Sequence, residues 1–240
     1  MPEPFGARAD VGAGPGQNGA MEQTNIVKVA GLTRTLLFVV GGILILAACG
    51  LGTLILLLPT PFPFDTWWNS VLVQNPIIFL TGFARVMDWI GGGWFGVLVV
   101  PILGAIALIL LRRPWSAAFF LTAEAASAGA VQIAKHAFGR ARPEDIIVIV
   151  DYGSFPSGHV ANAATLATAA FILFPRLWVL LIGIAYVLLM ALSRTALHAH
   201  WLSDTIGGAL IGAGMVLLIA GAFAPLLVRE RRDVRQLSSQ

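Results

Sequence analysis

Residues 35–64 contain no charged side chain, and the core of this stretch, residues 36–58, is apolar almost throughout. A helix that crosses a bilayer needs about 20 such residues. The core is too long for the apolar region of a cleavable signal peptide, and no small-residue cleavage site follows it. Only 11% of the chain is charged, against about 25% in soluble domains. The sequence therefore predicts an all-α integral membrane protein.

Further apolar segments along the chain complete a predicted bundle of six transmembrane helices. The expected spans are residues 36–58, 94–111, 115–138, 158–174, 177–197 and 201–228. The mixed segment 60–93 is rich in tryptophan, which suits a membrane–water interface. We predict an extracytoplasmic interfacial segment there, with one helix over 67–90; a further tilted span is the alternative.

The distribution of basic residues predicts the topology and the domain organisation. We expect a disordered cytoplasmic tail over 1–30, a six-helix membrane domain over 31–228 and a basic cytoplasmic tail over 229–240. Positive charge marks the cytoplasmic side of a membrane protein. With the amino terminus inside, the inner face receives these basic residues: Lys28, Arg34, Arg112, Arg113, Arg176, Arg229, Arg231, Arg232 and Arg235.

Three short polar clusters interrupt the apolar chain. In chain order they are K-x6-R-P at 135–143, P-S-G-H at 156–159 and S-R-x5-H-x3-D at 193–204. Ionisable groups among membrane helices are costly, so function is their default explanation. In the predicted topology all three clusters fall on the outer side, which is what a single composite active site requires.

His200 and Asp204 lie four residues apart at the start of a predicted helix, so they share one face. We predict that the carboxylate accepts a hydrogen bond from one imidazole nitrogen and leaves the other as a base or nucleophile. A purely structural His–Asp pair is the alternative. His198 competes for this role, but the residue four positions after it is the apolar Leu202.

Residues 156–159 indicate a helix start that suits an anion. Ser157 or Gly158 can cap the helix, and the free backbone amides and helix dipole favour negative charge at that end. His159 would stand beside the bound anion and could donate a proton to it.

Three cations accompany these groups. Lys135 and Arg142 lie on a predicted helix end and the loop after it, and Arg194 ends another helix. Together they could neutralise the oxygens of a phosphoryl group, which arginine forks match well. Each one alone could instead be a side chain that reaches from the membrane interface to the headgroups.

In this order the motifs resemble the three-part signature of the type 2 phosphatidic acid phosphatase superfamily, and every signature position is filled. The six-helix layout is similar to the membrane branch of that superfamily. The resemblance implies that His200 is the nucleophile, Asp204 its orienting partner and His159 the general acid. The implied phosphate ligands are Lys135, Arg142, Ser157, Gly158 and Arg194. The superfamily's chemistry uses no metal, so we expect neither a cofactor nor a metal.

We therefore expect a membrane lipid phosphatase that acts through a phosphohistidine at the outer membrane–water interface. Candidate substrates are phosphatidic acid, phosphatidylglycerol phosphate and a polyprenyl diphosphate such as undecaprenyl diphosphate. A lipid phosphotransferase and a non-catalytic lipid or phosphate transporter are the alternatives. The expected partners are the lipid phosphate and the bilayer, without nucleic acid. The compact chain, rich in glycine and alanine, favours a multi-pass protein of a bacterial plasma membrane.

We make separate predictions for three residues outside the motifs. Glu124 lies eleven positions before Lys135, on the same helix face but about 16 Å away along the axis. We expect it to be too deep for the chemistry and to make an interhelical hydrogen bond. Arg140 could add charge at the mouth of the site or contact headgroups. Cys49, the one cysteine, is expected to be a small buried hydrophobe.

Overall fold

The computed structural model describes residues 15–58 and 60–238, and these contain helices and loops but no strand. The helices are α1 (Pro15–Leu57), α2 (Pro63–Gln74), α3 (Ile78–Gly91), a π-helical turn η1 (Phe95–Val99), α4 (Val100–Leu110), α5 (Pro114–Phe138), α6 (Gly158–Leu173), α7 (Leu177–Ala196) and α8 (Leu202–Ser238). The all-α class predicted from the sequence is confirmed for this part of the chain.

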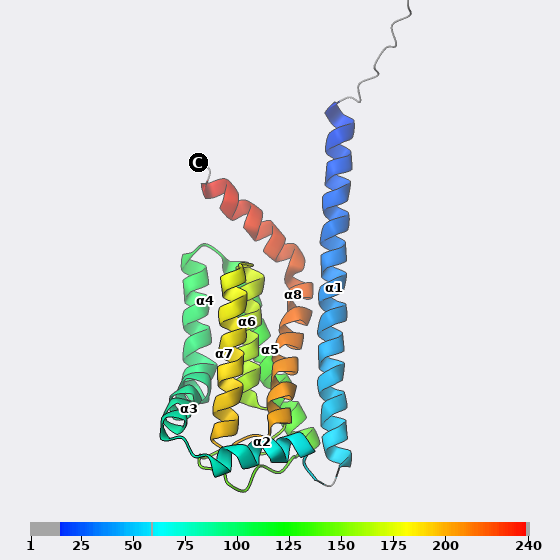
Figure 1. Ribbon diagram of the computed structural model, residues 1–240. Coiled ribbons are helices and arrows are strands. Elements are labelled where there is room, and N and C mark those ends of the chain that lie inside the picture. The colour runs from blue at the N-terminus through cyan, green and yellow to red at the C-terminus, as the bar shows by residue number, and fades with distance from the viewer. Residues whose placement is uncertain (1–14, 59, 239–240) are drawn as a thin grey trace, which may run out of the picture.

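Helices α4 to α8 stand side by side as a bundle, with α1 along one flank (Figure 1). Helix α8 is central to the packing, because it contacts α1, α5, α6 and α7. Helix α2 lies across one end of the bundle, beneath the ends of α7 and α8 (Figure 1). The loops that follow α5 and α7 meet at this same end.

Glycines allow α8 to approach the backbone of α6 closely. A Cβ atom on Gly208 would lie 2.4 Å from the carbonyl oxygen of Ser157, and one on Gly212 would lie 2.3 Å from that of Ala161. Small residues at such positions are typical of helix pairs in membranes. The contact places the first turn of α8, with Asp204, beside the first turn of α6.

Four helical segments are long and apolar enough to cross a membrane, among the residues the structure describes: Thr33–Leu57, Pro114–Phe138, Leu177–Ala196 and Leu202–Val234. Two shorter apolar helices, Phe95–Leu110 and Gly158–Leu173, stand among them. Counting α2 and α3 as one broken span gives a fifth. The total of six spans therefore stays a prediction.

The single interfacial helix predicted over 67–90 is wrong. The segment forms α2 and α3, which are bent by 119° relative to each other. The break follows from Asn75 and Pro76, since proline lacks a backbone donor and pushes the residue before it out of the helical conformation.

Large apolar side chains cover the outside of the helices. Leu46 is 72% exposed, Ile133 73% and Leu181 56%. Cys49 on α1 is also exposed, so the expectation that it is buried is wrong. The buried core between α4, α5, α6 and α8 contains many small and aromatic residues, including Ala123, Phe119 and Ala169, together with a few leucines. An apolar exterior is what contact with lipid chains requires.

Both predicted tails differ from the structure. Helix α1 begins at Pro15, so part of the segment 1–30 is helical here, and residues 1–14 lie outside the described part. Helix α8 continues through the predicted tail as far as Ser238. Its Glu230 carboxylate accepts hydrogen bonds from the backbone nitrogens of Trp115 and Ser116 at the start of α5. Charged residues of this segment therefore pack against the bundle.

Candidate active site

A cavity of about 590 Å³ lies among helices α3 to α7 and reaches the loops after α5 and α7. Its walls come from the α3–η1 junction, α4, α5, α6, α7 and the loops after α5 and α7. Five of the residues predicted to form the site line it: Lys135, Gly158, His159, Arg194 and His200. Distant parts of the chain thus converge on one space.

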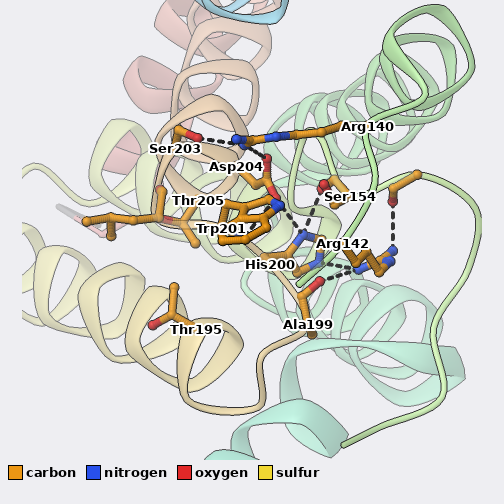
Figure 2. A network of polar contacts seen from close by, with 12 residues as sticks. Arg140, Arg142, Ser154, Thr195, Ala199, His200, Trp201, Ser203, Asp204 and Thr205 are labelled. Carbon is orange, nitrogen blue, oxygen red and sulfur yellow. Dashed lines mark hydrogen bonds and ion pairs between the residues drawn. The ribbon is translucent and has the colours of Figure 1, made fainter. Parts of the chain in front are cut away.

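His200 lies on the short turn between α7 and α8 and is 4% exposed. Its Nδ1 atom lies 2.7 Å from the carbonyl oxygen of Ser154, and its Nε2 atom lies 3.3 Å from Nη1 of Arg142 (Figure 2). A carbonyl can only accept a hydrogen bond and a guanidinium can only donate one. The proton therefore belongs on Nδ1, and Nε2 keeps its lone pair.

Asp204 is fully buried and has a different main partner from the one the sequence suggested. Its Oδ2 atom lies 3.7 Å from Nδ1 of His200, beyond hydrogen-bond distance. The same oxygen accepts a hydrogen bond from the backbone nitrogen of Trp201 at 2.9 Å. The other oxygen lies 2.5 Å from Nη1 of Arg140. The predicted direct hydrogen bond between the carboxylate and the imidazole is thus replaced by the Ser154 carbonyl.

Lys135 and Arg142 are held by the loop between α5 and α6. The Nζ atom of Lys135 lies 2.9 Å from the carbonyl oxygen of Gly153, and Nη2 of Arg142 lies 2.7 Å from the same oxygen. The carboxylate of Asp151 bridges the two cations, at 3.0 Å from Lys135 and 2.9 Å from Arg142. Arg142 also donates to the carbonyl of Ala199, beside His200.

Arg194 and His159 form a second group around Asp88. Nη1 of Arg194 forms a short ion pair with the Asp88 carboxylate. Nε2 of His159 lies 3.0 Å from the same carboxylate oxygen. The Nε atom of Arg194 is buried without a hydrogen-bond partner. The guanidinium thus keeps a donor that a phosphate oxygen could accept.

The start of α6 is as predicted, except for its cap. Ser157 is the residue before the first turn, but its side chain makes no capping hydrogen bond, and its hydroxyl is buried without a partner. Its backbone nitrogen donates to the carbonyl of Asp204 at 3.0 Å. Gly158 and His159 begin the helix, where backbone amides lack partners within the helix. Glycine at position 92 leaves room for the His159 side chain, since a Cβ atom on residue 92 would lie 1.9 Å from Nε2 of His159.

Comparison with known proteins assigns the chain to a family. Residues 116–226 match the model of the PAP2 superfamily. A decaprenylphosphoryl-5-phosphoribose phosphatase from Mycobacterium tuberculosis is 38% identical over 150 residues, which cover 60% of this chain and 80% of that protein. The chain belongs to the PAP2 superfamily. The resemblance drawn from the three motifs is thereby confirmed.

Another sequence relative and two solved structures are also similar to this PAP2 protein. The lipid A 1-phosphatase of Rhizobium etli is 32% identical over 124 residues, covering 46% of this chain and 51% of that protein. Among solved structures, the PAP2-type phosphatidylglycerolphosphate phosphatase of Bacillus subtilis matches with a TM-score of 0.53 at 23% identity, over 79% of this chain and 95% of that one. Aquifex aeolicus LpxE matches with a TM-score of 0.56 at 21% identity, over 72% and 99%. These two structures show a common fold.

Three carboxylates in the charge networks around the candidate site were not singled out from the sequence: Asp65, Asp88 and Asp151. The two expectations for Arg140 are both wrong, because it is buried between Asp65 and Asp204 rather than placed at the mouth or among headgroups. Asp88 and Asp65 could have been suspected, since carboxylates are rare in apolar segments.

Two further predictions from the sequence concern Glu124 and His198. Glu124 lines the same cavity as the motif residues, but its Oε1 atom is buried without a hydrogen-bond partner, so the predicted interhelical bond is absent for that atom. His198 points to α2, where its Nδ1 atom lies 2.7 Å from Oδ1 of Asn69. His200 is therefore the histidine of this pair that lines the cavity.

The charge states of two loop residues follow from their surroundings. Burial, reinforced by the charges of Arg194 and Arg142, lowers the pKa of His200 to about 3 although Asp204 opposes the shift. His200 is thus neutral at physiological pH. Burial raises the pKa of Asp151, but the hydrogen bond from Lys135 and the charges of both cations outweigh it, so this pKa lies below its usual value.

Proposed function

We propose that this PAP2 protein is a membrane lipid phosphatase that hydrolyses a lipid phosphomonoester or diphosphate through a phosphohistidine. The observation that supports it most is the neutral imidazole of His200, which keeps its lone pair on Nε2 at 3.3 Å from Nη1 of Arg142 and lines a cavity together with the buried cations Lys135 and Arg194. A neutral nitrogen nucleophile beside cations that can bind phosphoryl oxygens is a combination suited to phosphoryl transfer.

In the first step, Nε2 of His200 attacks phosphorus while the bond from phosphorus to the lipid oxygen breaks. His159 gives the departing oxygen a proton. The carboxylate of Asp88, 3.0 Å from His159, favours the protonated imidazolium that this step needs. Lys135, Arg142 and Arg194 stabilise the charge on the non-bridging oxygens. The phosphorylated imidazole of His200 carries positive charge, which the Asp204 carboxylate 3.7 Å away stabilises.

In the second step, His159 acts as a base and takes a proton from water. The water oxygen attacks phosphorus, and the bond from phosphorus to Nε2 breaks. The electron pair returns to Nε2, so His200 is again neutral, and inorganic phosphate leaves. The proton taken by His159 restores the acid for the next turnover.

The shape of the cavity favours a lipid as substrate. Beyond the cations, its wall includes Val97, Leu98, Ile102 and Leu121, each more than 40% exposed on the outside of the helices. An apolar chain could therefore extend from the phosphate site toward the bilayer. The named relatives act on decaprenylphosphoryl-5-phosphoribose and on lipid A. Their names favour a phosphomonoester on a lipid-linked sugar, in addition to the candidates expected from the sequence.

We also propose that the site faces the extracytoplasmic side. The loop between α4 and α5, which carries Arg112 and Arg113, lies at the end of the bundle opposite α2, and the loop with Arg176 before α7 lies at that same end (Figure 1). The turn between α7 and α8, which carries His200, lies at the α2 end (Figure 1). The positive-inside rule then puts that opposite end in the cytoplasm. The site would lie at the outer surface of a bacterial plasma membrane.

Phosphate release by purified protein tests the proposal. The assay measures inorganic phosphate from phosphatidic acid, phosphatidylglycerol phosphate, a polyprenyl diphosphate and a polyprenyl-linked sugar phosphate in detergent. His200→Ala should abolish release, whereas His198→Ala should retain most of it. Transfer of phosphate to an added lipid or sugar without release to water would indicate a phosphotransferase. Binding without release in the wild type would indicate a transporter.

A further inference from the structure

We propose that Arg140, Asp65 and Ser203 are positioning residues that fix the Asp204 carboxylate behind His200, which makes α2 part of the catalytic apparatus. The inference rests on the proposed function, because it assigns these residues an effect on phosphoryl transfer. The three residues belong to one hydrogen-bond network with Asp204, and none of them lines the cavity, so we assign their effect to Asp204 and not to the phosphate.

The guanidinium of Arg140 joins three acceptors at once (Figure 2 shows two of them). Nη1 lies 2.5 Å from Oδ1 of Asp204 and 2.7 Å from Oγ of Ser203. Nη2 lies 2.7 Å from Oδ2 of Asp65 on α2. Asp65 also accepts hydrogen bonds from the backbone nitrogen of Ser203 at 2.8 Å and from its hydroxyl at 2.6 Å.

The network is buried and packed on all sides. Asp65 is 1% exposed, Asp204 and Ser203 are 0% exposed, and the Arg140 side chain is 7% exposed. The ring of Trp201 lies against the guanidinium, at 5.6 Å from its carbon. Charges removed from water in this way need partners of good geometry, and the planar arginine fork supplies donors in fixed directions that a lysine ammonium does not.

This geometry sets which way the Asp204 carboxylate faces. Arg140 occupies Oδ1, while Oδ2 is held by the backbone nitrogen of Trp201 and faces Nδ1 of His200. Without the guanidinium of Arg140, the Asp204 carboxylate could rotate about its Cβ–Cγ bond. The oxygen that faces His200 would then lose its fixed position.

Asp65 affects Asp204 by sharing the charge of Arg140 with it. One arginine is shared between two carboxylates, so the group of Arg140, Asp65 and Asp204 carries one excess negative charge. When His200 attacks phosphorus, its ring becomes positive 3.7 Å from Asp204. An Asp204 carboxylate that is only partly neutralised stabilises that charge better than one paired to an arginine of its own.

The test compares Arg140→Lys, Asp65→Asn and the double variant with wild type. Arg85→Lys and Glu144→Gln are matched controls, because both residues are exposed and contact none of the network. Binding of ³²P-labelled inorganic phosphate at equilibrium counts the intact sites in each preparation. The kcat value for an aryl phosphate is then expressed per binding site, together with KM and the Ki of inorganic phosphate.

We expect kcat per site to fall about 10- to 100-fold in Arg140→Lys, since a misplacement of about 1 Å can cost about 10²-fold. Asp65→Asn should lower it about 3- to 30-fold. KM and Ki should stay within about threefold, because the cations that bind phosphate are untouched. The double variant should be no more than about threefold worse than Arg140→Lys, since Asp65 acts through Arg140.

Several results would overturn the inference. Unchanged kcat per site in both single variants would do so, as would equal losses in the controls. A third such result is a variant that binds phosphate at fewer sites but keeps the wild-type kcat at each remaining site. That result would show that the network only stabilises the fold. Absence of phosphate release by wild type is a separate outcome, which would reject the proposed function itself.

Discussion

The carboxylate of Asp151 contacts the two cations that are proposed to bind phosphate, Lys135 and Arg142. A phosphate that binds there must compete with this carboxylate. The Asp151 side chain is 58% exposed and lies on the loop between α5 and α6, so it can swing outward without disturbing a helix. We therefore predict that Asp151→Asn binds inorganic phosphate more tightly than wild type.

The two contacts set the magnitude. Exposed ion pairs contribute about 0.2–1 kcal/mol. We use this range for each contact because the Asp151 side chain is largely exposed, although the two cations are not, so the two contacts together amount to about 0.4–2 kcal/mol. The apparent dissociation constant of a ligand rises by the inverse of the fraction of protein that is free to bind it. Because about 1.4 kcal/mol corresponds to a factor of ten, the Ki of phosphate should fall about 2- to 30-fold.

The assay is competitive inhibition of aryl phosphate hydrolysis by inorganic phosphate at fixed ionic strength. Glu144→Gln removes the same charge from the same loop, from an exposed position that contacts neither cation. Its Ki should stay within about twofold of wild type, since Glu144 forms no ion pair with either cation and solvent-exposed charges interact weakly. A higher Ki in Asp151→Asn would refute the reasoning, because it would mean that Asp151 orients the cations for phosphate and does not compete with it.

Three further predictions concern metal, topology and pH. Phosphate release should survive excess EDTA, because the proposed steps use only side chains; full loss that added Mg²⁺ restores would reject them. In a Cys49→Ala background, Glu144→Cys should react with an impermeant thiol reagent on intact cells and Ser238→Cys should not; the reverse pattern would place the site in the cytoplasm. His200 has a pKa lowered to about 3, so its reactive neutral form persists as the pH falls below the ordinary imidazole value of about 6.5. After correction for ionisation of the substrate, the acid limb of kcat/KM should lie well below pH 6.5, and a limb at 6.5 would contradict the burial argument.

The motif residues were predictable because each motif is short and its chemistry is local. The spacing of His200 and Asp204 predicts that they lie one helical turn apart. In the structure His200 lies on the turn before α8 and Asp204 lies in the first turn of α8, at the same end of the bundle. The helix break at Pro76 could also have been predicted, since proline disfavours the helical conformation of the residue before it, here Asn75. We predicted a single helix instead because the tryptophans around this position suit a membrane interface.

The supporting charges were not predictable in the same way. Arg140 meets Asp65 across 75 residues and Asp204 across 64, and Arg194 meets Asp88 across 106. Such pairs depend on how α2 and α3 dock against the bundle, which no local pattern specifies. The sequence suggested that Asp204 pairs directly with His200, because it does not reveal that the Ser154 carbonyl is closer.

The central claim is that His200 accepts the phosphoryl group, and trapping that intermediate tests it most directly. Purified protein is mixed with ³²P-labelled substrate, quenched within milliseconds in base and examined for label on the protein that is stable to base and lost in acid. Wild type and His198→Ala should carry this label, and His200→Ala should carry none. Label that persists in His200→Ala but disappears in His198→Ala would contradict the account and give the nucleophile's role to the other histidine.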